Sequence, residues 1–208
     1  AALHLPTEAK IWDEFDSKQL LRNWHIPVVE EKIAADAADA WAFAQQVGLP
    51  VVLKGLAPDK AHKTEHGLVH LGIADQPQLL RAFEAFQGQL GGYGRILVQK
   101  QVAFDYELIA GFVRDDQFGG CVMFGLGGIL AELEPDVVFA LAPLDLDAAL
   151  RLVRSLRNWR LIEGFRGMTP LNQEVMAQLL VVAQEKRRPP HLGQHHIQVA
   201  VAIHVGIG

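Results

Sequence analysis

The chain has 208 residues, of which 50% are hydrophobic and 21% are charged, a composition typical of a globular protein with a substantial core. Its formal net charge of -5 argues against nucleic acid as the main partner, because backbone phosphates require a basic face. Cys121 is the only cysteine, which excludes an internal disulfide and a thiolate metal site.

We see no signal-peptide pattern and no apolar run of about 18 residues, so we expect a cytoplasmic protein without a membrane span. The first residue is alanine rather than methionine, which suggests a piece of a longer protein.

Helices and strands alternate in the first part of the chain. Apolar spacing and capping residues predict helices over residues 8–24, with Thr7 as the N-cap, over 36–47, closed by Gly48, and over 75–90. The expected strands are 28–33, 49–54 and 68–73, and a polar loop over 57–66 joins the last two.

The pattern changes after the glycine-rich segment 91–94, where short strands follow one another. We expect strands at 96–98, 106–113, 119–124 and 129–133, then helices over 145–159 and 172–184. Residues 1–94 and 95–184 are therefore predicted to form two lobes, with 185–208 as a divergent tail. Because helices and strands mix in both halves, the sequence predicts an α+β protein rather than a doubly wound sheet.

Lys54 ends an apolar run that resembles a buried strand. Burying an unpaired ammonium is strongly unfavourable, so a fixed anion should meet this side chain, and a phosphate is a natural one. The alternative is a lysine whose stem lies along the strand while its charge reaches the surface beside a polar turn. The pattern by itself leaves both interpretations open.

A glycine cluster lies at residues 125–128, between two apolar segments. Glycine permits close approach of a ligand to the backbone, but a tight hairpin explains the cluster equally well. The spacing matches neither the dinucleotide fingerprint nor the Walker A loop.

Four carboxylates, Glu107, Glu132, Glu134 and Asp136, form a third candidate set. Mg²⁺ in nucleotide sites binds one or two carboxylates together with phosphate oxygens. A solvated strand edge is the alternative, and it is favoured for Glu134.

These blocks, taken in order, resemble the ATP-grasp region of the NDP-forming (ADP-forming) acetyl-CoA and acyl-CoA synthetases, a region also found in related protein lysine acetyltransferases. The matching motifs are Val-Val-Leu-Lys at 51–54, Ala-Pro-Asp-Lys-Ala-His-Lys at 57–63, Phe-Gly-Leu-Gly-Gly-Ile at 124–129, and Gly-Phe-Arg-Gly at 164–167. The resemblance extends from about Thr7 to Val182. It implies an ATP-grasp fold of two α+β lobes with the nucleotide between them.

The resemblance also implies roles for residues on the nucleotide. Lys54 would contact its phosphates, Glu107 would lie near it, and Glu132 and Asp136 would bind Mg²⁺. The segment 99–102 would be the hinge that recognises adenine. The nucleotide-binding set implied in this way is Lys54, Lys63, Gln99, Lys100, Val102, Glu107, Gly127 and Gly128.

His62 matches the loop histidine that carries phosphate between distant sites in members of this family with separate subunits. Imidazole suits this task because its neutral form is nucleophilic near neutral pH. The implied parent reaction is acyl-CoA + ADP + phosphate ⇌ carboxylic acid + CoA + ATP. A CoA-binding domain or subunit would be the partner, with neither nucleic acid nor membrane involved. The alternative is a non-catalytic nucleotide-sensing module of a protein lysine acetyltransferase.

The chain departs from the family pattern in three places. Lys100 stands where many relatives have glutamate, and Thr-Glu-His-Gly-Leu follows His62-Lys63 in place of Ser-Asp and a glycine pair. The tail lacks the second acidic-Asn-Pro metal motif. Its histidines, His191, His195 and His196, would suit a transition metal, but a solvated tail is the favoured interpretation.

Overall fold

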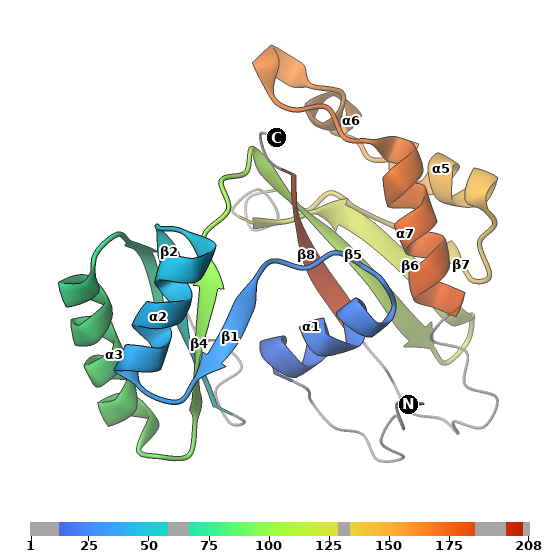
Figure 1. The fold of residues 1–208 in the computed structure, drawn as a ribbon. Coiled ribbons are helices and arrows are strands. Elements are labelled where there is room, and N and C mark those ends of the chain that lie inside the picture. The colour runs from blue at the N-terminus through green and yellow to red at the C-terminus, as the bar shows by residue number, and fades with distance from the viewer. Residues whose placement is uncertain (1–12, 58–66, 129–133, 186–198, 206–208) are drawn as a thin grey trace. The chain divides into compact units, whose positions relative to one another are not determined.

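The computed structural model describes residues 13–57, 67–128, 134–185 and 199–205. The chain divides into two compact units, one formed by Ile11–Val102 and the other beginning at Ala103. Each unit contains one four-stranded sheet in which every described strand pairing is antiparallel. Figure 1 shows the ribbon with most of these strands labelled. Mixed helices and antiparallel sheets confirm the predicted α+β class.

The first unit has the strand order β1-β4-β2-β3, and helices α2 and α3 pack against the sheet. The buried core between them includes Leu53, Val98, Phe83 and Phe86. The elements are α1 (Glu14–Asn23), β1 (Glu31–Ala34), α2 (Ala37–Val47), β2 (Val51–Leu56), β3 (Val69–Ile73), α3 (Gln76–Leu90) and β4 (Arg95–Lys100).

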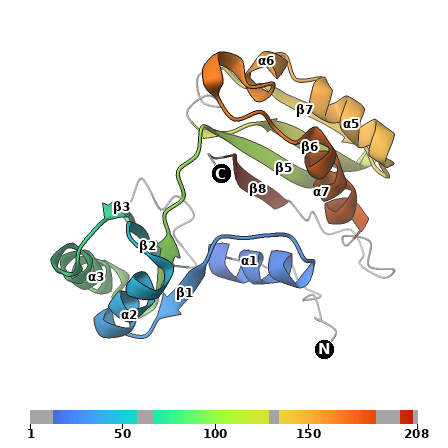
Figure 2. The same ribbon diagram turned by 45° about the horizontal axis from the view of Figure 1, so that its top comes forward.

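The second unit has the strand order β7-β6-β5-β8. Helices α5 and α7 contact each other and this sheet, an arrangement visible in Figure 2. Their shared core includes Leu108, Phe124, Leu152, Val153 and Leu180. The elements are β5 (Tyr106–Asp115), β6 (Gly119–Leu126), β7 (Val137–Leu141), α5 (Leu146–Arg154), α6 (Trp159–Ile162), α7 (Gln173–Glu185) and β8 (Val199–Val205).

The first residues of three helices agree with the positions predicted from the sequence, because each follows an aspartate that caps the helix. Asp36, Asp75 and Asp145 are the N-caps of α2, α3 and α5, and each side chain accepts a hydrogen bond from the amide three residues on, which satisfies a donor that the helix itself cannot. Gly91 ends α3 in the left-handed conformation with φ 56°, where glycine carries no steric penalty.

Several expectations differ from the structure. Thr7 lies outside the described residues, and within them α1 begins at Glu14, with Asp13 as its N-cap. The helix expected over 145–159 ends at Arg154, because the carboxylate of Asp136 accepts the amides of Arg157 and Asn158 and diverts them from helical bonding. The strand expected at 129–133 lies outside the described residues.

The division of the chain also differs from the expected lobes. Strand β4 was expected to open the second lobe, but it pairs with β1 and β2 in the first unit, which therefore extends to Val102. Neither β7 nor β8 is among the predicted strands, and β8 comes from the segment expected to be a tail. It pairs with β5 from Tyr106↔Val205 to Phe112↔Val199. Within the described ranges, no helix is both long and apolar enough to cross a membrane.

The core of the first unit gives a stability prediction. Phe83 is 2% exposed in the cluster between α3 and the sheet, so Phe83→Ala should lower the free energy of unfolding by about 3–5 kcal/mol through lost burial and the cavity left behind. Urea denaturation measures the change. Tyr93 is 92% exposed, and Tyr93→Ala is the matched control, with an expected change of at most about 0.5 kcal/mol. Equal effects of the two substitutions would contradict this core.

Candidate functional site

Three polar side chains lie on one face of the first sheet, and strand periodicity explains why. Leu53 belongs to the core under α2 and α3, so its neighbour Lys54 lies on the opposite face. Gln99 is in register with both Val52 and Glu31, which places Gln99 and Glu31 on the same face as Lys54.

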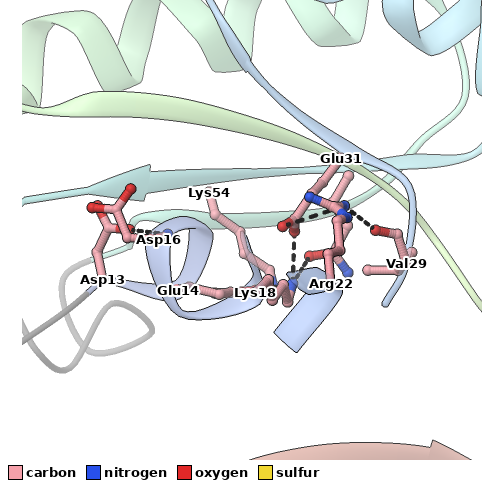
Figure 3. Close-up of polar contacts among 9 residues, drawn as sticks. Asp13, Glu14, Asp16, Lys18, Arg22, Val29, Glu31 and Lys54 are labelled. Atoms are coloured by element: carbon pink, nitrogen blue, oxygen red, sulfur yellow. Dashed lines mark hydrogen bonds and ion pairs between the residues drawn. The ribbon is translucent and has the colours of Figure 1, made fainter. Parts of the chain in front are cut away.

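Helix α1 contributes charged side chains to this face. Glu14, Lys18 and Arg22 are spaced four residues apart and therefore share one side of the helix. The ammonium of Lys18 donates hydrogen bonds to Glu14 Oε1 at 2.7 Å, Glu31 Oε2 at 2.8 Å and Gln99 Oε1 at 2.9 Å. Figure 3 shows this side of α1 turned toward the strands that carry Glu31 and Lys54.

Lys54 is ion-paired with the same helix. Its Nζ lies 2.6 Å from Glu14 Oε1, the oxygen that Lys18 also contacts, and its side chain is 19% exposed. A mostly covered ammonium beside a carboxylate favours the interpretation of Lys54 as a cation that needs a fixed anion over that of a surface lysine. We call Lys54, Glu14, Lys18, Glu31 and Arg22 the α1 charge network.

Glu31 is the most buried member of the α1 charge network, with a side chain 0% exposed. Burial raises its pKa above the ordinary value of 4.5, while the hydrogen bond from Lys18 and the charges of Lys18 and Arg22 oppose that rise. No donor among the described residues makes a hydrogen bond to its Oε1, although Arg22 Nη2 lies 3.7 Å away. Arg22 is itself held by a 2.9 Å hydrogen bond to the carbonyl of Val29.

In the segment predicted to recognise adenine, some backbone and side-chain groups already contact other residues of the chain. The amides of Lys100 and Gln101 donate to the carbonyls of Glu30 and Pro50, and the Lys100 ammonium lies 3.5 Å from Glu30. Val102 is exposed. The adenine role of 99–102 stays a prediction.

In the second unit the structure brings Glu107, Gly127 and Gly128 together. The amide of Gly127 donates to the carbonyl of Glu107 at 2.9 Å, and a Cβ on Gly127 would lie 3.0 Å from Ile109. Gly128 has φ +61°, and a Cβ there would overlap the Glu107 carboxylate. The left-handed backbone at Gly128 favours glycine, and a side chain at Gly127 would crowd Ile109 and Glu107. The contact of both glycines with nucleotide stays a prediction.

Asp136 has a structural task in the second unit. It is 4% exposed, and its two carboxylate oxygens accept the amides of Arg157 at 3.0 Å and Asn158 at 2.7 Å. Exposed Glu134 pairs with the Arg157 guanidinium at 2.8 Å, as expected for a solvated edge. The metal role of Asp136 stays a prediction.

The remaining predicted residues, His62, Lys63, Glu132 and the tail histidines, lie outside the described residues. Among the residues that are described, no group of three or more His, Cys, Asp or Glu side chains is placed to hold a metal ion.

The sequence-based reasoning missed Glu14, Lys18, Arg22 and Glu31. The signal that identifies the first three is their four-residue spacing, which the apolar pattern of the same helix obscured. Glu31 carries no comparable signal, because the burial of its carboxylate depends on the register of β1 with β4 and on the contact with Lys18.

Comparison with known proteins identifies the family to which this chain belongs. A family model described as an ATP-grasp domain matches residues 4–185, and the chain belongs to that family. It is 33% identical over 178 residues to the ADP-forming acetate–CoA ligase I subunit beta of Pyrococcus furiosus, covering 83% of this chain and 77% of that protein. It is 35% identical over 167 residues to the ADP-forming acetate–CoA ligase I of Archaeoglobus fulgidus, covering 78% of this chain but only 24% of that protein.

Solved structures give the same result. The chain resembles ACD1 of Ca. Korarchaeum cryptofilum in complex with coenzyme A, with a TM-score of 0.74 and 33% identity over 82% of this chain and 77% of that one. The acetyl-coenzyme A synthetase 1 of the same organism, in complex with coenzyme A and Mg-AMPPCP, matches with a TM-score of 0.71 and 33% identity, covering 83% and 76% of the two chains. Its phosphohistidine segment points towards the nucleotide-binding site. These likenesses confirm the predicted ATP-grasp fold.

Glu31 gives a prediction for the pH dependence of stability. Because its pKa is raised in the folded state, its favourable contribution is complete below the unfolded-state pKa and is lost as pH rises through the folded-state pKa. The stability of Glu31→Gln relative to the natural chain should therefore increase as pH rises from about 4 to about 7. Urea titrations of both proteins across that range measure the difference.

The control for this experiment is Glu30→Gln, which removes the neighbouring exposed carboxylate. A Glu31→Gln difference that stays constant with pH, or that slopes like the Glu30→Gln difference, would contradict the assignment of a costly buried charge to Glu31.

Proposed function

We propose that the chain is the nucleotide-binding domain of an ADP-forming acid–CoA ligase and binds ADP or ATP with Mg²⁺. The observation that carries the proposal is Lys54, a mostly covered ammonium on the polar face of the first sheet that already lies 2.6 Å from an anionic oxygen. The names and bound ligands of the relatives, which include Mg-AMPPCP, support the same ligand class.

The residues of this chain suit a nucleotide phosphate. A phosphate oxygen resembles the Glu14 carboxylate oxygen in charge and in hydrogen-bond capacity, so Lys54 can bind it by the same charge-assisted contact. Glu132 is the proposed Mg²⁺ ligand, with Asp136 nearby in sequence. Bound Mg²⁺ would supply charge neutralisation on the phosphate oxygens.

His62 is proposed to relay the phosphoryl group. Its neutral imidazole attacks the phosphorus of an acyl phosphate, forming a P–N bond as the P–O bond breaks and the carboxylate leaves. Attack by the terminal phosphate oxygen of ADP then breaks the P–N bond, forms ATP and returns neutral His62. Lys63, the next residue, would stabilise the negative charge on the phosphoryl oxygens.

The proposed partner is a CoA-binding domain or subunit. The Pyrococcus relative is named as a beta subunit, whereas this chain spans about a quarter of the Archaeoglobus relative. The CoA-binding part would accordingly reside in a second chain or in another region of the same protein.

The acetyltransferase alternative receives no support from these comparisons. The relatives described above are named as CoA ligases and synthetases. We therefore do not retain the nucleotide-sensing module as a second proposal.

Lys54 provides the direct test of nucleotide binding. Lys54→Met should weaken binding of Mg-ADP by roughly 10- to 150-fold, because one charge-assisted phosphate contact is worth about 1.5–3 kcal/mol. Calorimetric titration measures the affinity, and thermal unfolding shows whether the variant is folded. Lys32→Met is the matched control, since Lys32 pairs with Asp39 at an exposed edge of the same unit. Unchanged affinity of a folded Lys54→Met variant would disprove the phosphate contact.

His62 is tested by phosphoryl labelling of the chain together with its CoA-binding partner. We expect acid-labile label from [γ-³²P]ATP on the natural chain and on His66→Ala, and none on His62→Ala, because only His62 accepts the phosphoryl group. Gel autoradiography before and after acid treatment measures the label. Label that persists on His62→Ala and disappears on His66→Ala would refute the assignment.

A further inference from the structure

One carboxylate oxygen in the α1 charge network serves two cations. Glu14 Oε1 lies 2.7 Å from Lys18 Nζ and 2.6 Å from Lys54 Nζ. Glu14 is on α1, and Lys54 is on β2, 40 residues further along the chain. The same oxygen therefore links the helix to the strand lysine that we propose binds phosphate.

Lys18 is held in place by contacts other than the one to Glu14. Besides Glu14, the Lys18 ammonium donates to the fully covered Glu31 at 2.8 Å and to Gln99 at 2.9 Å. An ammonium has three N–H donors, so these three acceptors satisfy Lys18 completely. Lys18 is consequently fixed on the sheet, and it stays paired with Glu14 whether or not Lys54 remains in contact with Glu14.

We propose that Glu14 is an exchangeable counter-ion, which holds Lys54 in the absence of nucleotide and releases it to a phosphate oxygen when ADP or ATP binds. The inference rests on the proposed function and deepens it, because it adds Glu14 and Lys18 to the nucleotide site as positioning residues. Figure 3 shows the side chains of Glu14, Lys18 and Lys54 converging between α1 and the strand that carries Lys54.

The exchange is feasible because neither charge is stranded. Breaking an isolated partly buried ion pair leaves an uncompensated charge, which is strongly unfavourable. Here Lys18 remains beside Glu14 after Lys54 leaves, and the phosphate takes over the neutralisation of Lys54. The resting pair still competes with the nucleotide, so Glu14 lowers nucleotide affinity below the value that a pre-released Lys54 would give.

The test is the affinity of the full chain for Mg-ADP, measured by calorimetry. Glu14→Gln keeps an acceptor for Lys18 but removes the charge that competes for Lys54, and it should tighten binding by roughly two- to fivefold, the size of a partly exposed ion pair. In a Lys54→Met background the same substitution should change nothing. Glu14→Asp shortens the reach to Lys54, and a smaller gain is expected from it, which keeps the test available if Glu14→Gln does not fold.

Asp16→Asn is the matched control. Asp16 is on the same helix and pairs with Arg95 rather than Lys54, so its substitution changes the net charge equally without releasing Lys54. Weaker binding by Glu14→Gln would overturn the proposal and make Glu14 a support for Lys54, whereas equal gains in Glu14→Gln and Asp16→Asn would reduce it to a bulk charge effect.

Failure of the proposed function gives a different result. If Lys54→Met alone binds Mg-ADP as the natural chain does, Lys54 is not a phosphate ligand, and both the proposed contact and the exchange are wrong. If Lys54→Met weakens binding while Glu14→Gln does not tighten it, the phosphate contact stands and only the exchange is wrong.

Discussion

The polar face of the first sheet depends on the three acceptors around Lys18. Glu31 has a side chain without solvent exposure, and a carboxylate in that position is tolerated only with a paired cation and hydrogen bonds. Lys18 supplies both, and its contacts to Glu31 and Gln99 join α1 to strands β1 and β4. This arrangement explains why the helix that opens the described chain packs on the side of the sheet opposite α2 and α3.

The same constraint places Lys54 in chemical context. Its ammonium is mostly covered and shares the Glu14 oxygen with Lys18, so the charge is held in position before any ligand arrives. In the proposed exchange, a phosphate oxygen takes the place of the Glu14 oxygen beside this ammonium. The network thus connects the stability of the first unit to the nucleotide chemistry proposed for it, because the residues that compensate Glu31 also position the carboxylate beside Lys54.

The second unit uses its predicted residues mainly to hold the backbone in place. Asp136 fixes the turn between α5 and α6 through two amides, and Gly127 and Gly128 let the chain after β6 pack against Glu107. Strand β8 shows that a segment without family resemblance still completes the sheet beside β5. An apolar stretch with alternating β-branched residues can take such an edge position without any motif, because pairing depends on backbone hydrogen bonds and pleat.

The sequence by itself determined the elements whose signals are local. Asp36, Asp75 and Gly91 fixed the ends of α2 and α3, and the ordered motifs identified the ATP-grasp family, because capping and motif spacing depend on neighbouring residues. Only the tertiary structure decided that β4 belongs to the first unit and that the helix expected over 145–159 ends at Arg154. It also decided that Glu14 contacts both Lys54 and Lys18, and that Lys18 contacts Glu31. These features depend on strand register and on contacts between residues far apart in the chain, which hydrophobic periodicity does not specify.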